Sequence, residues 1–366
     1  MQLMRLFQPD NFSESEIKYK KAPNDSHFVA VLNHYFREYT LRGVFQLDRP
    51  EVNSENYKAI LDVKGRLRTV LIRKYKSLSN LEQVHFYLTL IENLAKNGVP
   101  VSRIIKNERG ESAMEAGGDI VALFEFIDGQ YFPGTEESLA SAAEAIAKMH
   151  ASFGVLSQNT LSQIAQFSSK TKAYYNIIEA YSVSDFVTIR EIIEKKANKN
   201  DSDRVVLEKM PLFITTVTEI KNFESSWLLL PRKLIHSDLH PHNVLFKNGL
   251  VAAILDFDAV RISQQARDVA FALYRFGRQC LIGTDEEQAK FLGPRLRELF
   301  IEKYMQIKKI SSEELRLMPL LVKDEFIKKL LLVLKGTYLE DNRIWAKDLP
   351  KFLVAIEEID YFWPIQ

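Results

Sequence analysis

A polar loop flanked by short apolar segments is the feature that most constrains the fold of this chain of 366 residues. Residues 234–246 have the sequence LIHSDLHPHNVLF, and residues 254–258 have the sequence ILDFD. Asn243 follows Asp238 by five positions, and Asp256 follows Asn243 by thirteen. Because the flanking apolar segments are typical of short strands, the fold must hold this loop and the end of a later strand in place.

These three residues have the chemistry that phosphoryl transfer from ATP requires. The Asp238 carboxylate can orient an attacking hydroxyl and accept its proton. Mg²⁺ takes oxygen ligands, usually only a few of them from the protein, which predicts that the Asn243 amide and the Asp256 carboxylate bind the metal. Such a transfer depends mainly on positioning and charge neutralisation. The pattern H-x-D-x-x-x-x-N followed by an Asp at a strand end is typical of kinases.

Two other interpretations of this loop stay open. Asp and Asn residues between strands are often turn residues that bond their own backbone. In addition, His236, Asp238, His240 and His242 occupy alternate positions, which in a strand would place them on one face as a transition-metal centre. Pro241 disfavours a regular central strand, and no histidine follows His242 in the chain.

The loop at residues 236–243 resembles the H-G-D-L-H-P-G-N loop of the aminoglycoside phosphotransferase and choline kinase family. This family is the small-molecule branch of the protein-kinase-like fold. Ser237 and His242 stand where the family usually has Gly, and neither change removes a functional group. Residues 254–258 are similar to the family's I-D-F/W-D/E segment. Protein kinases have a Gly after the Phe, so its absence after Phe257 favours the small-molecule branch.

The resemblance implies an α+β fold with two lobes. The N-lobe, residues 1–127, would hold an antiparallel sheet and one helix. Before them we expect an irregular arm, residues 1 to about 23, and a first helix with Phe28, Val31, Leu32, Tyr35 and Phe36 on one face. The C-lobe, residues 128–366, would be mainly helical and carry the catalytic loop. ATP and Mg²⁺ would lie between the lobes, and a small-molecule hydroxyl (an amino sugar, aminoglycoside, amino alcohol or sugar-like acceptor) would receive the phosphoryl group. Alternatives are a kinase-like scaffold or weakly active pseudokinase, and a protein Ser/Thr kinase; the oligomeric state is open.

Nucleotide contacts in the N-lobe follow from the same resemblance. Alternating patterns predict strands at residues 43–47, 56–63 and 68–75, the last two joined by a hairpin turn. The last strand matches the one that carries a phosphate-binding cation, with Arg73 where Lys is more usual. Strand alternation sends Arg73 and Lys74 to opposite faces, and we favour Arg73 as the residue in the cleft. Residues 120–129 resemble the hinge, where adenine would bond main-chain groups near Glu125 and Ile127.

Two departures from the family pattern support the scaffold alternative. The segment that would cover the nucleotide, residues 50–56, contains no glycine, whereas a Gly-rich loop lets backbone N–H groups approach phosphate closely. The helix predicted at residues 79–97 is expected to bury the face that carries Leu81, Val84, Leu88, Ile91 and Ala95. It has Tyr87 where kinase-like folds use a Glu to hold the cation. Glu82 and Glu92 are candidate substitutes on other turns of that helix.

Two residues of the predicted C-lobe are expected to have structural roles and not to take part in the chemistry. His150 closes a helix that begins at Thr135, and we interpret it as a packed core histidine. Asp268, near the start of a helix after the ILDFD segment, resembles the family's Asp that braces the catalytic loop.

Composition excludes several other classes of function. The net charge of +1 at pH 7 gives no sign of a nucleic-acid or anionic-membrane partner. Cys280 is the only cysteine, which excludes an internal disulfide and fits a reducing compartment. Residues 1–10 lack the apolar core of a signal peptide, and the densest apolar run, residues 330–334, is too short to span a bilayer. We therefore expect a cytoplasmic protein with no membrane or nucleic-acid partner.

Overall fold

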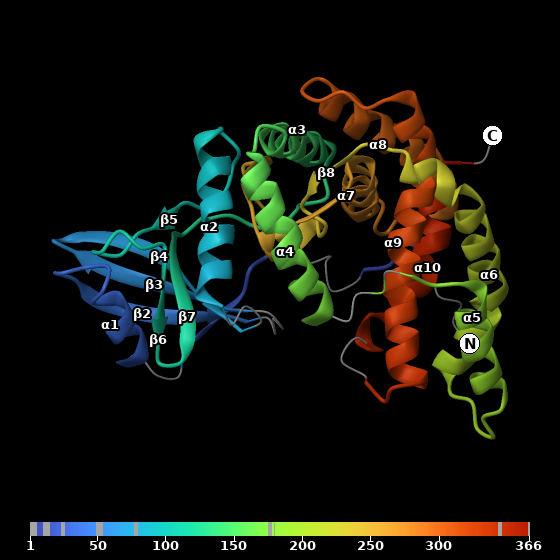
Figure 1. The fold of residues 1–366 in the computed structure, drawn as a ribbon, viewed down its shortest axis with the longest axis horizontal. Helices are drawn as coiled ribbons and strands as arrows, with labels where there is room; N and C mark the ends of the chain where they lie inside the picture. Colours follow the sequence, from blue (N-terminus) through green and yellow to red (C-terminus); the bar gives the residue numbers. More distant parts are fainter. Residues whose placement is uncertain are drawn as a thin grey trace.

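A computed structural model describes residues 6–9, 15–22, 26–48, 54–76, 80–174, 178, 180–342 and 346–364. A β-sheet lies at one end of the molecule and a large group of helices at the other (Figure 1). This is the α+β arrangement that the sequence predicts. The boundary that we place after residue 127 falls just beyond the last strand of the sheet.

The N-lobe sheet is antiparallel and has seven strands, in the order β1-β2-β3-β4-β7-β5, with β6 also paired to β7. The strands are β1 (Tyr19–Lys21), β2 (Thr40–Leu47), β3 (Ser54–Val63), β4 (Arg66–Tyr75), β5 (Ile104–Ile105), β6 (Ala113–Ala116) and β7 (Asp119–Glu125). Lys64 and Gly65 both have positive φ, 54° and 79°. Two such residues form the tight hairpin turn that matches strand twist, so the predicted β3–β4 hairpin is confirmed.

One face of the sheet packs against helix α1 (Ser26–Leu32). The apolar face predicted for this helix and the residues after it is buried, at Phe28, Val31, Leu32, Tyr35 and Phe36. These side chains form a core with alternate residues of the strands, among them Val70 and Ile72 of β4. Side chains on the opposite face of β4, such as Leu71 and Tyr75, join a second core that continues into the helical lobe.

Helix α2 (Leu81–Lys96) is capped by Asn80, whose side chain accepts hydrogen bonds from the backbone N–H groups of residues 82 and 83. The predicted extent of this helix is confirmed, but its predicted buried face is only partly right. Val84 and Leu88 are buried as expected. The side chains of residues 81, 91 and 95 are only partly covered, whereas Tyr87, Leu90 and Leu94 are fully buried. The helix is rotated because it packs against both the sheet and the helical lobe.

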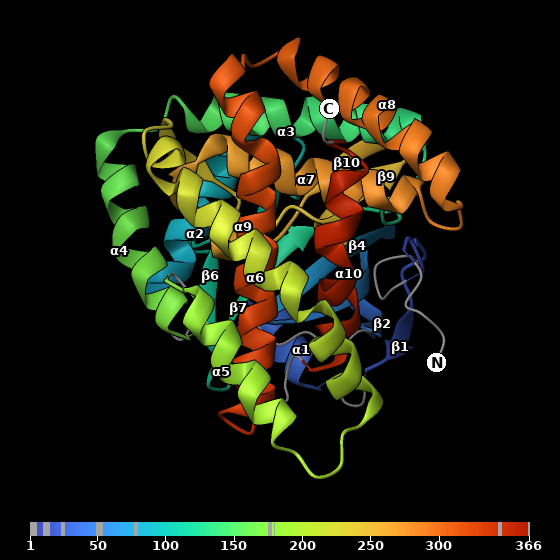
Figure 2. The same ribbon diagram turned by 90° about the vertical axis from the view of Figure 1, so that its right-hand side faces the viewer.

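The helical lobe contains α3 (Glu136–Phe153), α4 (Gln158–Tyr174), α5 (Val183–Glu194), α6 (Asp201–Leu228), α7 (Gln265–Cys280), α8 (Glu286–Met305), α9 (Ser312–Tyr338) and α10 (Leu349–Asp360). Helix α7 is buried along almost its whole length. Helix α9 packs against α6, α7 and α10 (Figure 2). Two small antiparallel pairs complete the lobe: β8 (Arg232–Ile235) with β11 (Arg261–Gln264), and β9 (Val244–Lys247) with β10 (Leu250–Ile254).

The first described residues of the predicted N-terminal arm contact the helical lobe, whereas residues 19–21, which we expected to be irregular, form strand β1 at the edge of the sheet. Phe7 is 1% exposed, and its backbone N–H donates to Glu358 Oε1 at 2.6 Å. Arg278 Nη2 donates to the backbone oxygen of Gln8 at 3.0 Å. These contacts join residues 7 and 8 to α7 and α10 rather than to the sheet. No helix in the described part of the chain combines the length and apolar character needed to cross a membrane.

Candidate active site

The catalytic loop and the ILDFD segment lie side by side because backbone hydrogen bonds join them. Strand β8 leads into the loop, and the β9–β10 hairpin returns the chain to Leu255. The Leu255 N–H donates to the Asn243 carbonyl at 2.8 Å. His236 Nε2 lies 2.8 Å from the Leu255 carbonyl. The residue directly before Asp256 is therefore held to both ends of the loop that carries Asp238.

Hydrogen-bond geometry assigns the tautomer of His236. The Asp238 backbone N–H can only donate, and it points at His236 Nδ1 at 3.3 Å. Nδ1 is therefore the acceptor and Nε2 carries the hydrogen that is donated to Leu255. The His236 side chain is fully buried and its ring lies 4.9 Å from that of Phe257. A buried imidazole thus links the two segments through both of its ring nitrogens.

Asp268 of α7 braces the loop, as the family resemblance implies. Its carboxylate accepts hydrogen bonds from the backbone N–H groups of His236 and Ser237, each at 2.8 Å. His150 Nε2 donates to the same carboxylate at 3.0 Å, and His150 Nδ1 lies 2.8 Å from the Tyr304 hydroxyl. Ser237 has a φ of 74°, a conformation that suits glycine and costs an L-residue about 1–2 kcal/mol. The two hydrogen bonds that the Asp268 carboxylate accepts offset that strain.

The Asp238 carboxylate is hydrogen-bonded but still accessible, with 33% of its side chain exposed. Asn243 Nδ2 donates to the backbone oxygen of Asp238 at 2.9 Å and to Asp238 Oδ2 at 3.2 Å. His240 Nδ1 accepts from the His242 N–H at 3.3 Å, so His240 Nε2 carries hydrogen and donates to Asp238 Oδ2, also at 3.3 Å. Lys329 Nζ, from α9, lies 3.5 Å from Asp238 Oδ1.

These neighbours control the charge of Asp238. Burial alone would raise the pKa of its carboxyl, but His240 and Lys329 outweigh burial and hold that pKa well below 3.8. Burial also lowers the pKa of His240 below 6.5. His240 is therefore mainly neutral at pH 7 and acts as a hydrogen-bond donor, and Lys329 supplies the positive charge. Asp238 is an ionised carboxylate across the physiological range.

The two predicted metal ligands come from the two joined segments. Asn243 uses its Nδ2 toward Asp238, and its Oδ1 makes no hydrogen bond to any residue that the structure describes. Asp256 has a left-handed backbone, with φ 61° and ψ 67°, and 32% of its side chain is exposed. Strain of this kind in a non-glycine residue is common at functional sites. An amide oxygen and a carboxylate oxygen are thereby available to a hard cation.

Asp256 and Asp258 share a single guanidinium. Arg73 Nη2 of β4 lies 2.8 Å from Asp256 Oδ1 and 2.8 Å from Asp258 Oδ2. Burial raises the pKa of Asp258 to about 6; Arg73 opposes this shift and the Asp256 carboxylate adds to it. Two carboxylates with one cation leave negative charge uncompensated, so the site fits a further divalent cation.

The described residues contain no group of three or more His, Cys, Asp or Glu side chains that could hold a metal ion by themselves. Both ring nitrogens of His236 make hydrogen bonds within the protein, and His240 is bonded to Asp238. The His242 ring packs 4.3 Å from that of Tyr131. A two-oxygen site of Asn243 and Asp256 is the kind that Mg²⁺ uses together with substrate phosphates.

Of the two candidate phosphate-binding cations on β4, only Arg73 points toward the catalytic segments. Arg73 reaches the catalytic segments, whereas Lys74 points to the other face of the sheet, with Nζ 2.7 Å from Asp119. Neither candidate substitute for the missing helix glutamate contacts Arg73. Glu82 is exposed, and Glu92 pairs with Lys106 at 3.2 Å.

The predicted hinge positions are at the end of β7. The Glu125 N–H donates to Arg103 at 2.8 Å, and its carbonyl accepts from Ser102 Oγ at 2.6 Å. Ile127 makes no backbone–backbone hydrogen bond to any described residue. Ile127 is thus the better candidate of the two for a main-chain hydrogen bond with adenine. Residues 50–53 of the predicted covering segment lie outside the described residues, and β3 begins at Ser54.

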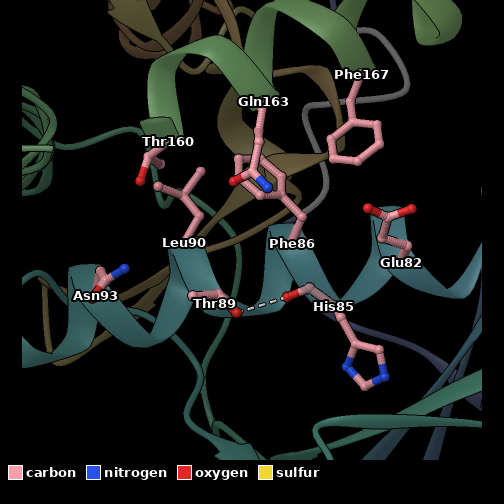
Figure 3. A pocket seen from close by; sticks show the side chains of 9 residues that line it. All are labelled: Glu82, His85, Phe86, Thr89, Leu90, Asn93, Thr160, Gln163 and Phe167. Atoms are coloured by element: carbon pink, nitrogen blue, oxygen red, sulfur yellow. Dashed lines mark hydrogen bonds between the residues drawn. The ribbon is translucent and has the colours of Figure 1, made fainter. Parts of the chain in front are cut away.

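Two residues of the site were not assigned from the sequence. Asp258 was visible in the ILDFD pattern, but nothing in the sequence paired it with Arg73. Lys329 lies in α9, far along the chain, and only the packing of α9 against α7 brings it to Asp238. A pocket between α2 and α4, shown in Figure 3, is separate from this site, because its lining, which includes Glu82, Phe86 and Phe167, contains neither Asp238, Asn243, Asp256 nor Arg73.

Comparison with known proteins defines the class. The family model described as "Phosphotransferase enzyme family" matches residues 49–300, more than half of the chain, and the chain belongs to this family. Among curated relatives, the homoserine kinase of Zymomonas mobilis is 24% identical over 265 residues, which cover 72% of each protein. The homoserine kinase of Paramagnetospirillum magneticum is 26% identical over 293 residues, covering 76% of this chain and 77% of the relative.

Solved structures show the same fold. An aminoglycoside phosphotransferase from Alicyclobacillus acidocaldarius aligns with a TM-score of 0.62 at 17% identity, covering 94% of this chain and 95% of that one. A spectinomycin phosphotransferase, solved with ADP and spectinomycin, aligns with a TM-score of 0.59 at 13% identity, covering 94% and 99%. The predicted kinase-like α+β fold is confirmed, and the chain is a phosphotransferase by family.

Proposed function

We propose that this protein transfers the terminal phosphoryl group of ATP, with Mg²⁺, to a hydroxyl of a small molecule. The observation that carries the proposal is the joining of two segments. His236 and Asn243 bond Leu255 on both sides, so the Asp238 carboxylate and the Asp256 carboxylate are fixed relative to each other. A hydroxyl and a metal-bound phosphate could then be held in one geometry, which is most of what phosphoryl transfer requires.

Asp238 would orient the acceptor hydroxyl. With a pKa well below 3.8 its carboxylate is a weak base, so it would not remove the proton from a free hydroxyl. In a loose transition state the attacking oxygen becomes acidic only as it bonds to phosphorus. Asp238 would therefore hold the hydroxyl by a hydrogen bond and accept its proton late. Asn243 and His240 keep the carboxylate in place through their own hydrogen bonds.

Asn243 and Asp256 would hold the metal, and Arg73 would contact the nucleotide phosphates. A bound Mg²⁺ supplies charge neutralisation for the phosphate oxygens. The Arg73 guanidinium now bridges Asp256 and Asp258, and its several N–H donors allow it to keep Asp258 while contacting a phosphate oxygen. Main-chain groups at Ile127 would bind adenine. Glu125 is the weaker candidate because its N–H and carbonyl already make hydrogen bonds.

Homoserine is our leading candidate for the acceptor, because the relatives of similar length carry that name. Amino sugars, aminoglycosides and amino alcohols are the other candidates. The scaffold alternative rests on the glycine-free covering segment and on Tyr87, which stands where a glutamate is expected on α2. The Arg73–Asp258 ion pair weakens this alternative because it supplies another anchor for the cation.

The test is ADP release from Mg·ATP by the purified full-length chain with a panel of acceptors. The panel would contain homoserine, 3-aminopropan-1-ol, ethanolamine, glucosamine, an aminoglycoside and a cell extract separated by size. We expect acceptor-dependent release with at least one small molecule, and a product that carries a phosphate monoester. Release only with the protein fraction would favour a protein kinase. Mg·ATP binding in calorimetry without any turnover would favour the scaffold.

A further inference from the structure

Lys329 of α9 lies beside Asp238 and is partly exposed. Its Nζ lies 3.5 Å from Asp238 Oδ1, and 33% of each side chain is exposed. The ammonium also lies 4.9 Å from the centre of the buried Phe271 ring of α7. The ammonium is thus held near both Asp238 and the Phe271 ring, while about a third of the Lys329 side chain stays exposed. An ammonium has three donors, so one contact with Asp238 leaves it able to bind a further anionic group.

Two other positively charged side chains act on the same region of the molecule as Lys329. Arg275 of α7 and Lys351 of α10 are both largely buried, and Lys351 Nζ lies 2.9 Å from Asp348. Burial lowers the pKa of Lys351 to about 8, and the positive charges of Arg275 and Lys329 act in the same direction. Lys329 and Arg275 thus both act on Lys351, which has Asp348 as its ion-pair partner.

The carboxylates of α9 nearest to Lys329 are already neutralised. Asp324 is bonded to Arg267 and, at 2.7 Å, to Lys328. Glu325 accepts from Arg261 at 2.8 Å and from Arg267 at 3.0 Å. Binding a polycationic acceptor here would require breaking these buried ion pairs, which is costly because it leaves charges without partners.

We propose that Lys329 binds a carboxylate of the acceptor and makes this enzyme selective for hydroxy acids over cationic hydroxyl compounds. The inference rests on the proposed function. A hydroxyl about 2.7 Å from Asp238 and a carboxylate about 2.8 Å from Lys329 would suit a short hydroxy acid. The Lys329–Asp238 contact fixes the distance between the hydroxyl subsite and the carboxylate subsite. Lys329 would therefore select acceptors by both their length and their charge.

The experiment compares two acceptors that differ in one group. Homoserine and 3-aminopropan-1-ol carry the same hydroxyl and amine, but only homoserine has the carboxylate. The ratio of their kcat/KM values is measured for the wild type, Lys329→Met, Lys329→Arg and Lys328→Met. Lys328 is the matched control, since it lies on the same helix and bonds Asp324 rather than Asp238. Further hydroxy acids and their amides extend the panel if homoserine is not the acceptor.

We expect the wild type to prefer the carboxylate-bearing acceptor by more than tenfold. Lys329→Met should bring the ratio close to one through a higher KM, Lys329→Arg should restore part of it, and Lys328→Met should leave it unchanged. Equal losses on both acceptors would overturn the inference, since Lys329 would then act on Asp238 or the phosphoryl group. Turnover restricted to acceptors without an anionic group would also overturn it, while leaving the proposed function intact. No ADP release with any acceptor would contradict the proposed function itself.

Discussion

The guanidinium of Arg73 lies 2.8 Å from the carboxylate of Asp258, and this pair connects the N-lobe sheet to the segment that follows β10. Both side chains are largely buried, 12% and 9% exposed. The helix that packs beside them offers Tyr87 in place of a glutamate. Asp258 therefore gives Arg73 a fixed anchor from the other lobe, and Asp256 shares the same guanidinium.

We predict that Asp258→Asn weakens nucleotide binding more than turnover. Without its anchor, Arg73 would move toward Asp256 and lose its position for the phosphates. We expect the KM for Mg·ATP to rise about tenfold, a change of about 1.4 kcal/mol, with a smaller effect on kcat. Lys74→Met is the control, because Lys74 lies on the opposite face of β4 and should leave this KM unchanged. An unaltered KM in the Asp258 variant would remove the anchoring role.

Metal dependence tests the assignment of Asn243 and Asp256. Replacing either oxygen ligand, as in Asn243→Ala or Asp256→Asn, should raise the Mg²⁺ concentration needed for half-maximal activity by more than tenfold. Asp128→Asn removes an exposed carboxylate that pairs only loosely with Lys247, at 3.9 Å, and should not change it. If the Mg²⁺ titrations of all three variants match the wild type, the metal lies elsewhere.

Stability should depend on Asp268. Asp268→Asn leaves one fewer charged acceptor for the backbone N–H groups of His236 and Ser237 and for His150, all within the core. Loss of charge from such a buried network costs about 2–4 kcal/mol in free energy of unfolding. Urea denaturation followed by circular dichroism measures this change. A variant with wild-type stability would mean that the loop holds its left-handed Ser237 without help from α7.

Cys280 gives a prediction about pH. Burial raises the pKa of its thiol to about 12, with a smaller contribution from the Glu136 carboxylate. The unfolded thiol has a pKa of about 8.5. The stabilisation from this group is therefore complete below pH 8.5 and is lost as the pH rises toward 12. At pH 8 we expect iodoacetamide to label the native thiol at least a hundredfold more slowly than the urea-unfolded chain, measured by mass spectrometry. Equal rates would contradict the burial of the thiol.

Local signals explain which parts of the structure were predicted from the sequence. Helix α1 was predicted because its apolar residues repeat with helical spacing, and the β3–β4 hairpin because Gly65 marks a tight turn. The catalytic loop was predicted because the positions of Asp238, Asn243 and Asp256 depend on a short loop and one hairpin. The structure joins the two segments that carry these three side chains, while their catalytic roles stay predictions.

Tertiary contacts explain what the sequence could not provide. Nothing near Lys329 in α9 signals that it meets Asp238, since that contact depends on how α9 packs on α7. The buried face of α2 is rotated relative to the predicted one because both lobes cover this helix. A single apolar stripe in the sequence does not encode contacts with two lobes. Phe7 gave no sign of its place against α7 and α10, because an isolated apolar residue in a polar segment has no periodicity to interpret.

The central claim is that Asp238 holds the acceptor hydroxyl next to a nucleotide that other residues bind. The most direct measurement compares Asp238→Asn with the wild type in both Mg·ATP affinity, by calorimetry, and acceptor-dependent ADP release. Asn keeps the shape of the side chain but cannot accept the proton, so we predict nearly unchanged affinity and a kcat lower by about 10²–10⁴-fold. Undiminished turnover in the Asp238→Asn protein would contradict the account.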